Sequence, residues 1–344
     1  MKVGNYINMG LGVLKANVLG RKTPLSVMFS VTNRCTSKCL YCDIPLRKQK
    51  ELTTEEALRL IDEMAEAGVQ KLSLWGGEPL LRNDIADLID RAKSAGMVVS
   101  IDSNGYLIPA KLDELKHLDF IILSFDGEKE YHDKNREAGA YDKFFKAVRI
   151  INGRIPIWTL TVLTKYNIDS VDFIIQKAEE HGFQTMFQVP YHPAGIGSQN
   201  DIFGKPSEYQ RVFQHLIDLK RSNAPIISST NYLRIAARWP FFPETTSNDS
   251  FKSNLKCWAG KLFCNIDTNG DMYPCSPMIN GFSPLNILDK PFKDCFMELS
   301  TPPCRICLSA CSVEANLAFS FDALTILEWA RRFQKDEKIR LKRS

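Results

Sequence analysis

Apolar residues between about residue 25 and residue 225 occur in short continuous runs that alternate with stretches of helical spacing. The short runs predict buried strands of a parallel sheet, and the helical spacing predicts amphipathic helices between them. Strands are expected at residues 25–31, 71–75, 98–102, 120–124, 157–163 and 185–189. Helices are expected at residues 53–67, 84–95, 141–151 and 170–181. Repeated βα units of this kind predict an α/β fold, built as a partial barrel or as a doubly wound sheet.

The rest of the chain follows a different pattern. Residues 224–250 are rich in Pro, Ser, Thr and Asn around an aromatic island at 239–242, which indicates a linker or a substrate-facing loop. Cysteines and turns then dominate, and a helix is expected at 322–338. The predicted organisation is an N-terminal segment (1–22), the α/β domain (23–225), the linker or loop (226–256), a cysteine-rich module (257–311) and a C-terminal helix with a basic tail (312–344).

Composition excludes several classes of protein. The chain has 344 residues, 44% of them hydrophobic and 24% charged, which is typical of a folded globular protein and not of a disordered one. The net charge of +4 is small and concentrated in the tail at 331–344, so a solvated helix end is expected there and no nucleic-acid partner. Without a secretory signal or an 18-residue apolar run, a cytoplasmic protein is expected. The apolar segment 1–22 is expected to pack across the base of the barrel, with weak contact to a membrane surface as the alternative.

Ten cysteines fall into two groups, and the first group indicates a metal centre. Cys35, Cys39 and Cys42 directly follow the first predicted strand, so their thiols lie on a loop at its carboxyl end, where barrel enzymes place their chemistry. A structural zinc site would require a fourth protein ligand. Three thiolates on an iron-sulfur cube instead leave one iron open to a ligand from outside the protein.

These residues resemble the signature of the radical S-adenosylmethionine (radical SAM) superfamily, Cys-x3-Cys-x2-Cys with an aromatic residue, here Tyr41, before the last cysteine. Three segments after the next strands resemble further motifs of the family: Trp75-Gly76-Gly77-Glu78-Pro79, Ser103-Asn104-Gly105 and Ser124-Phe125-Asp126-Gly127. The resemblance implies a partial (β/α)6 TIM-type barrel and a [4Fe-4S] cluster whose open iron binds S-adenosylmethionine (AdoMet). It implies that Glu78 accepts from the methionine amino group and that Ser124 and Arg136 hold the carboxylate. The expected cosubstrate contacts are Tyr41, Gly76, Gly77, Glu78, Pro79, Ser103, Asn104, Ser124 and Arg136.

Other polar residues at strand ends are weaker candidates. Asp102, Asp126 and His132 are hypothesised to orient or deprotonate the substrate, although polar residues at such positions are more often plain turn residues. The loop after the sixth strand is expected to contact the substrate through Gln188, Tyr191 and His192. The sequence assigns no catalytic acid or base.

The second cysteine group resembles the SPASM and twitch modules that bind auxiliary [4Fe-4S] clusters. It comprises Cys257-x17-Cys275, with the turn Asn269-Gly270 between them, and Cys304-x2-Cys307. Full SPASM modules have seven cysteines at more regular terminal spacing for two clusters, so the resemblance implies a single auxiliary cluster held by Cys257, Cys275, Cys304 and Cys307. Cys264 and Cys311 stay alternative ligands, and Cys295 is expected to be structural. Zinc is the alternative occupant, because four thiolates in a small module also satisfy it.

The resemblance implies an enzyme that reductively cleaves AdoMet to a 5′-deoxyadenosyl radical, supplied with electrons by a flavodoxin- or ferredoxin-type donor. The substrate is expected to be a small molecule, a cofactor precursor or a lipid-like molecule, because about 24 residues precede the first strand and leave no room for a leader-binding domain. The aromatic island at 239–242 would suit such an apolar ligand. The alternatives are a peptide-modifying maturase and a nonenzymatic iron-sulfur or zinc protein.

Overall fold

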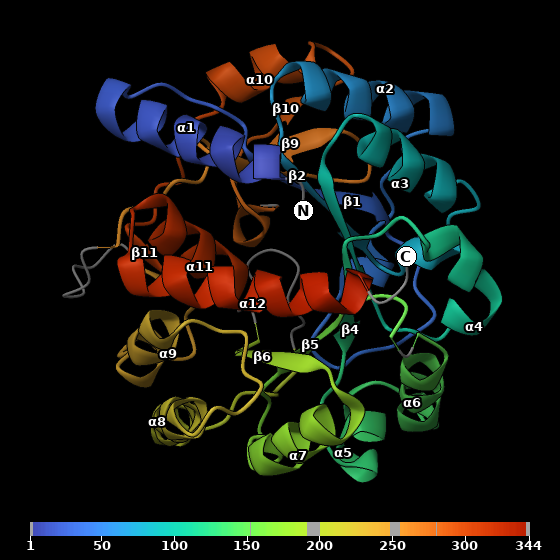
Figure 1. The fold of residues 1–344 in the computed structure, drawn as a ribbon, viewed down its shortest axis with the longest axis vertical. Helices are drawn as coiled ribbons and strands as arrows, with labels where there is room; N and C mark the ends of the chain where they lie inside the picture. The colour runs from blue at the N-terminus through green and yellow to red at the C-terminus, as the bar shows by residue number, and fades with distance from the viewer. Residues whose placement is uncertain (1–2, 152, 191–199, 248–254, 280, 342–344) are drawn as a thin grey trace.

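Six parallel strands that pair in chain order form the centre of the protein (Figure 1). The computed structural model describes residues 3–151, 153–190, 200–247, 255–279 and 281–341. The strands are β1 (Ser26–Thr32), β2 (Lys71–Gly76), β3 (Val98–Ser103), β4 (Phe120–Ser124), β5 (Ile157–Val162) and β6 (Gln184–Gln188). Each pairs in parallel with the next. A doubly wound sheet reverses its strand order at a switch point, and this sheet does not, so the partial barrel is confirmed.

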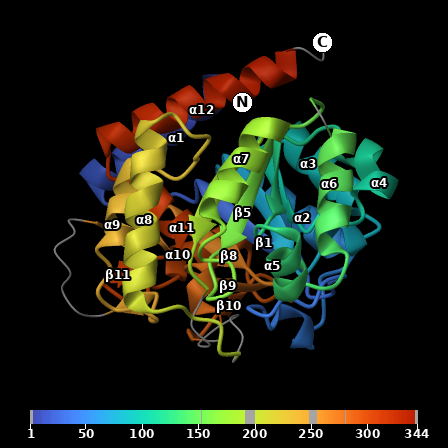
Figure 2. The same ribbon diagram turned by 90° about the horizontal axis from the view of Figure 1, so that it is seen from below.

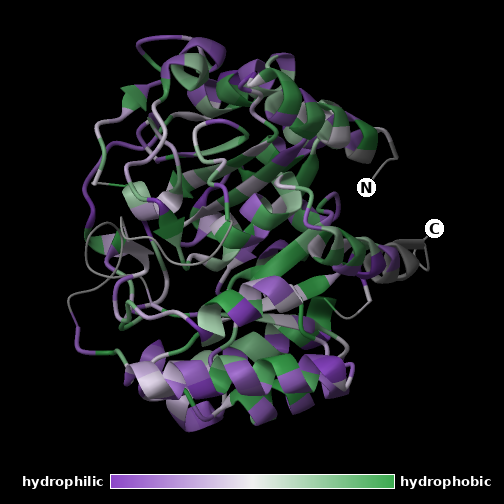
Figure 3. Cartoon of the chain, turned by 90° about the vertical axis from the view of Figure 1, so that its left-hand side faces the viewer, coloured by the Kyte–Doolittle hydropathy of each residue, from purple (hydrophilic) through white to green (hydrophobic). Residues whose placement is uncertain are grey.

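Helices surround this sheet and cover its outer face (Figure 1). They are α2 (Thr54–Glu66), α3 (Ile85–Ser94), α4 (Ile108–Lys111), α5 (Lys129–Asn135), α6 (Ala140–Ile151), α7 (Val171–His181), α8 (Pro206–Arg221) and α9 (Thr230–Ala237). In α2 the predicted capping box is confirmed, since the Glu56 N–H donates to Thr53 Oγ1 and the Thr53 N–H to the Glu56 carboxylate. Helix α2 buries Leu60, Ile61 and Met64 at the spacing that produced the prediction. Figure 3 shows hydrophobic residues along the strands and mixed hydropathy on the helices.

Helix α9 lies in the segment that the sequence suggested was a linker or loop. The Tyr232 N–H donates to Ser229 Oγ at 3.1 Å, so this helix has an ordinary N-cap. Its Tyr232 and Leu233 are buried in the main core. The aromatic island at 239–242 also packs into this core, where Trp239 is fully buried.

Three strands of the C-terminal region, β8 (Phe263–Ile266), β9 (Asp271–Tyr273) and β10 (Leu285–Asn286), extend the same sheet, whereas β7 (Thr246–Ser247) and β11 (Ile306–Cys307) pair with each other in a separate two-stranded sheet. The helices of this region are α10 (Phe292–Glu298), α11 (Ala310–Phe319) and α12 (Ala323–Leu341). Strand β8 pairs in parallel with β1, and β9 pairs with β8 as the expected hairpin around Asn269-Gly270. The resulting sheet has the order β10-β9-β8-β1-β2-β3-β4-β5-β6. The cysteine-rich module therefore continues the barrel sheet at the β1 edge.

Helix α11, which the sequence did not predict, joins the two edges of the partial barrel. On one side Glu314 accepts from the Ser229 N–H, next to α9. On the other side Asn316 Oδ1 accepts from the Trp258 N–H at 2.8 Å, ahead of β8. Since α11 lies between these edges, residues at its start reach the interior of the barrel.

Helices α1 (Val3–Leu19) and α12 lie across the amino-terminal ends of the strands (Figures 1 and 2). Val13 and Ala16 of α1 are buried against Leu25 and Phe319, so the expected packing across the barrel base is confirmed. Among the described residues, no single helix is long and apolar enough to span a membrane. The bent pair of helices Ala310–Phe319 and Ala323–Gln334 meets these criteria of length and composition only when the two are taken together.

Candidate active site

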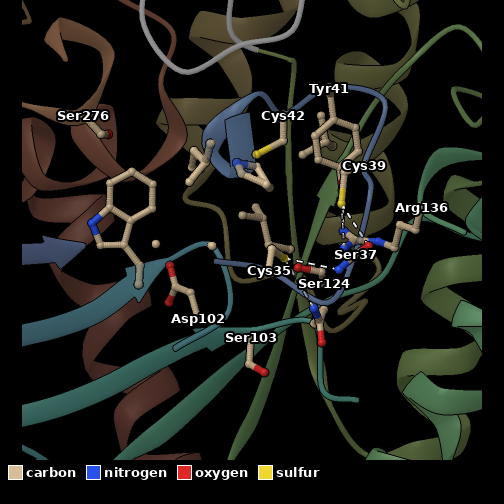
Figure 4. Close-up of a pocket in the computed structure, with 18 of the residues that line it drawn as sticks. Cys35, Ser37, Cys39, Tyr41, Cys42, Asp102, Ser103, Ser124, Arg136 and Ser276 are labelled. Atoms are coloured by element: carbon tan, nitrogen blue, oxygen red, sulfur yellow. Dashed lines mark hydrogen bonds between the residues drawn. The ribbon is translucent and has the colours of Figure 1, made fainter. Parts of the chain in front are cut away.

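The loop after β1 places three cysteine thiols around one cavity. Cys35, Cys39 and Cys42 all line it (Figure 4). The pKa of Cys42 is raised to about 12, chiefly by burial and next by the neighbouring thiol of Cys39, with a smaller contribution from Cys35, so the three thiols lie near one another. The three thiols thus form the cradle that a three-cysteine cluster requires.

Hydrogen-bond donors surround these sulfur atoms. Cys35 Sγ accepts from the Ser37 N–H at 3.4 Å and from Asn104 Nδ2 at 3.8 Å. Cys39 Sγ accepts from Arg136 Nη1 at 3.5 Å and lies 3.4 Å from Ser37 Oγ. Donors of this kind stabilise thiolates and tune the potential of an iron-sulfur cluster. The residues present therefore fit a [4Fe-4S] cluster.

Gly76 and Gly77 allow the end of β2 to pack directly on the cysteine loop. A Cβ on Gly76 would lie 2.3 Å from the Thr32 carbonyl oxygen, and one on Gly77 would lie 2.2 Å from that of Arg34. The Gly77 N–H donates to Thr32 O and the Glu78 N–H donates to Arg34 O, both at 2.7 Å. The glycines also line the cavity, as expected, but close packing between the two loops is what excludes a side chain.

Glu78 is fully buried and organises the neighbouring motif. Its carboxylate accepts from Ser103 Oγ and the Asn104 N–H, both at 2.8 Å, and from the Leu80 N–H at 3.1 Å. The pKa of Glu78 is raised to about 7, because burial raises it by more than these hydrogen bonds lower it. Ser103 and Asn104 line the cavity, whereas Glu78 and Pro79 are buried beside it. The predicted contact between Glu78 and the methionine amino group stays a prediction.

A buried ion pair holds Arg136 against the cysteine loop. Arg136 Nε donates to Asp126 Oδ2 at 2.8 Å, Tyr41 OH donates to the same oxygen at 3.1 Å, and Arg136 Nη2 also contacts Tyr41 OH. Asp126 is held in turn, because its N–H donates to His132 Nδ1 at 3.0 Å. Arg136, Tyr41 and Ser124 line the cavity, where a guanidinium can pair with a carboxylate.

The hypothesised substrate residues separate in the structure. Asp126 and His132 are fully buried and support Arg136, whereas Asp102 lines the cavity on the other side (Figure 4). Gln188 also lines the cavity, as expected, while Tyr191 and His192 lie outside the described residues. The sequence did not predict that Trp75, Ser276 and Cys311 would line the cavity, which they do. It named Trp75 only as the first residue of the glycine motif and Cys311 only as an alternative ligand of the auxiliary cluster, and Cys311 reaches the cavity because α11 begins there.

The C-terminal cysteines sort into three places. Burial raises the pKa of Cys275 well above its usual range, and the thiols of Cys307, Cys257 and Cys304 raise it further, so these four lie together. Cys264 and Cys295 are buried in the core, where the Cys295 thiol lies close enough to raise the pKa of the Cys264 thiol. Cys311 opens into the cavity beside Asp102 and Lys71. This sorting supports the four-cysteine set of the predicted auxiliary site, which stays a prediction.

Comparison with known proteins identifies the class. Residues 29–178 match the family model described as the radical SAM superfamily. The chain is 30% identical over 263 residues to PqqA peptide cyclase of Ruegeria pomeroyi (73% of this chain, 67% of the relative). It is 27% identical over 297 residues to AdoMet-dependent heme synthase of Methanosarcina barkeri (79% of this chain, 81% of the relative).

A solved structure has the same fold. SuiB of Streptococcus suis bound to its precursor peptide SuiA superimposes with a TM-score of 0.67 at 18% identity, over 84% of this chain and 68% of SuiB. The chain belongs to the radical SAM superfamily and is a radical SAM enzyme, with a [4Fe-4S] cluster and AdoMet as its cofactors.

Proposed function

We propose that this enzyme modifies a peptide by radical chemistry started from AdoMet. The observation that carries the proposal is its 30% identity to a PqqA peptide cyclase over 73% of the chain. The sequence alone favoured a small molecule, a cofactor precursor or a lipid-like molecule as the substrate. The similarity to a peptide cyclase favours the alternative that the sequence left open, a peptide-modifying maturase.

The residues that line the cavity have different roles in such a reaction. When bound, the cluster and AdoMet would supply the radical chemistry that removes a hydrogen atom from the substrate. Cys35, Cys39 and Cys42 would hold the cluster, and Arg136, fixed by Asp126, would pair with the methionine carboxylate. Apolar side chains of the cavity wall exclude water from the reacting atoms: Met28, Ile44, Leu160 and Val162.

A second candidate substrate is a cofactor precursor of the tetrapyrrole class. It is favoured by the similarity to AdoMet-dependent heme synthase, which spans 81% of that relative. This candidate agrees with the expectation of a cofactor precursor from the sequence. The two substrates differ in chemistry, because a peptide presents amide groups and a tetrapyrrole of this kind presents carboxylates.

We also propose one auxiliary [4Fe-4S] cluster held by Cys257, Cys275, Cys304 and Cys307, and a flavodoxin- or ferredoxin-type protein as the electron donor. The mutual proximity of these four thiols supports the first proposal. The need of the first cluster for single electrons supports the second.

Weak contact with a membrane surface is proposed for helix α1. Its outward face exposes Ile7, Leu11, Leu14 and Val18, with Lys15 on the helix and Arg21 after it. Apolar side chains beside cations suit an anionic lipid surface. Cosedimentation with phosphatidylglycerol vesicles tests this, since the double variant Leu11→Ser, Leu14→Ser should bind less than the wild type. Equal binding by both proteins would remove the proposal.

The test of the main proposal uses the anaerobic, reconstituted enzyme with AdoMet and a reductant. Synthetic peptides encoded by short reading frames beside its gene are offered in one set of reactions, and porphyrin carboxylates in another. A covalent mass change in a peptide that depends on AdoMet is expected, and the Cys35→Ala variant should give none. Turnover of the porphyrins with every peptide unmodified would decide for the second candidate.

A further inference from the structure

Three polar atoms on the cavity wall have no hydrogen-bond partner among the described residues. They are Nε1 of Trp75, Oδ1 of Asp102 and Oε1 of Gln188. Trp75 and Gln188 are only 9% and 8% exposed, so their polar atoms are largely removed from solvent. An unpaired buried donor or acceptor destabilises a ligand-free site, and a ligand that pairs with it removes that cost.

The three residues come from β2, β3 and β6 and face the interior of the barrel. Ser100 Oγ donates to Ser73 Oγ at 3.1 Å, so the side chains of these two positions on β3 and β2 point to the same side of the sheet. Side chains alternate along a strand, and therefore Trp75 and Asp102, two residues further on, also point to that side. Gln188 ends β6, on the other side of the same cavity.

Cys311 completes this wall from a distant part of the chain. It stands one residue inside α11, the helix that joins the two edges of the partial barrel. The pKa of its thiol is raised to about 11, chiefly because the protein removes water from it and next because of the Asp102 carboxylate, while Lys71 lowers it. Cys311 therefore lies beside Asp102, and not with Cys257, Cys275, Cys304 and Cys307.

We propose that Trp75, Asp102, Gln188 and Cys311 form the substrate subsite, and that this subsite binds a peptide segment through its backbone amides. Substrate N–H groups donate to Asp102 Oδ1 and Gln188 Oε1, and a substrate carbonyl accepts from Trp75 Nε1. Cys311 contacts the bound segment without forming a bond to it. The inference rests on the proposed peptide substrate and assigns the residues that recognise it.

The polarity of the subsite distinguishes a peptide from a polycarboxylate. Two of the three unpaired atoms are acceptors, and a peptide backbone supplies N–H donors for them together with a carbonyl for the indole. A carboxylate of a tetrapyrrole has no proton to donate to Asp102 Oδ1 or Gln188 Oε1. The subsite is thus complementary to amide groups.

The thiol of Cys311 provides a direct reporter of occupancy. The reconstituted holoenzyme is alkylated with iodoacetamide under anaerobic conditions, and modification of Cys311 is quantified by mass spectrometry. Alkylation is compared with AdoMet alone, with AdoMet plus the synthetic peptides described above, and with AdoMet plus a porphyrin carboxylate. A peptide at about ten times its Kd should slow alkylation about tenfold relative to AdoMet alone, because only the free fraction reacts.

Variants separate this inference from the proposed function. In the double variant Trp75→Phe, Gln188→Leu, peptides should no longer protect Cys311, whereas the control Trp158→Phe, at the start of β5, should retain protection. The subsite would be overturned by any of four results for the alkylation of Cys311. These are full protection by AdoMet alone, protection by the porphyrin only, no protection by any probe, and protection by peptides in the double variant equal to that in the wild type. If the wild type modifies a peptide while the double variant is protected equally, the proposed function stands and the subsite is wrong.

Discussion

Arg136 shows how neighbouring side chains fix a residue that lines the cavity. Its guanidinium contacts Asp126, Tyr41 and the sulfur of Cys39, and its own side chain is almost completely buried. A buried cation is costly unless it is paired and hydrogen-bonded, and the Asp126 carboxylate supplies both. The polar residues around the cavity therefore divide into those that contact ligands and those that hold them in place.

The Cys35→Ala variant should lose AdoMet cleavage and keep its fold. Stability comes mainly from the apolar strands and helices, and the cysteine loop lies outside that core. Release of 5′-deoxyadenosine under reductant measures cleavage, and circular dichroism measures the fold. Cys264→Ala is the matched control and should still cleave AdoMet, because its thiol lies in the core of β8. Undiminished 5′-deoxyadenosine from Cys35→Ala would contradict the assigned ligand.

His132 should make the protein less stable in mild acid. Burial lowers the pKa of His132 well below its usual value of 6.5, and Arg136 lowers it further. Below the usual pKa of 6.5 the histidine of the unfolded chain binds a proton that the buried histidine of the folded protein does not. The free energy of unfolding therefore falls as the pH decreases, by up to about 1.4 kcal/mol per pH unit. Urea denaturation from about pH 7 to about pH 5 measures this decrease. The variant His132→Asn should have a shallower pH dependence, and identical slopes would refute the explanation.

At the scale of elements, the β8–β9 hairpin supports the loop that carries the first cysteine group. Arg47, which follows that loop, pairs with Asp267 at the start of the hairpin turn, with Nη1 3.0 Å from Oδ1. The Leu52 N–H donates to Thr268 O at 2.7 Å, and Asn33 Nδ2 donates to Thr268 Oγ1 at 3.0 Å. The hairpin therefore determines where the chain around the cysteine loop lies, as well as bearing Cys275 at its end.

Arg47→Met should destabilise the protein and reduce AdoMet cleavage together. It leaves the fully buried Asp267 carboxylate without its cation, which costs about 3–5 kcal/mol for a buried pair. The double variant Arg47→Met, Asp267→Asn removes the uncompensated charge and should recover part of the stability. Denaturant midpoints and 5′-deoxyadenosine release measure the two effects. A single variant as stable as the wild type would show that the pair does not support the loop.

At the scale of the whole molecule, the first cysteine group and part of the second are attached to one continuous sheet. Cys307 of the second group lies in β11, which pairs with β7 in a separate two-stranded sheet. The first group follows β1, and Cys257 and Cys275 of the second flank the β8–β9 hairpin; β8 pairs directly with β1, and β9 pairs with β8. A cluster in the second site would therefore be held at a constant position relative to the first.

The reconstituted enzyme should contain about eight iron atoms per chain if both sites hold four-iron clusters. The double variant Cys257→Ala, Cys275→Ala should lose about half of this iron and keep the first cluster. Elemental analysis for iron, sulfide and zinc measures both. Zinc recovered from the wild type and lost in the double variant would decide for zinc in the second site.

The sequence by itself determined the elements and motifs whose signals are local. Strand and helix periodicity, the Thr53 capping box and the spacing of Cys35, Cys39 and Cys42 depend on neighbours within a few residues, so they predicted the alternating strands and helices and the cysteine loop. The resemblance of the motifs to a known family, and not the periodicity, chose the partial barrel over a doubly wound sheet. The glycine pair was also recognisable, although its packing partner in the Thr32 and Arg34 backbone was not.

Only the tertiary structure decided how distant segments meet. Helix α11, which joins the edges of the barrel, brings Cys311 to Asp102, and the pairing of β8 with β1 brings Asp267 to Arg47. The same packing separated Cys264, Cys295 and Cys311 from the four thiols that lie together. These contacts connect residues far apart in the chain, and no local spacing specifies them, because they follow from which apolar faces can be buried against one another.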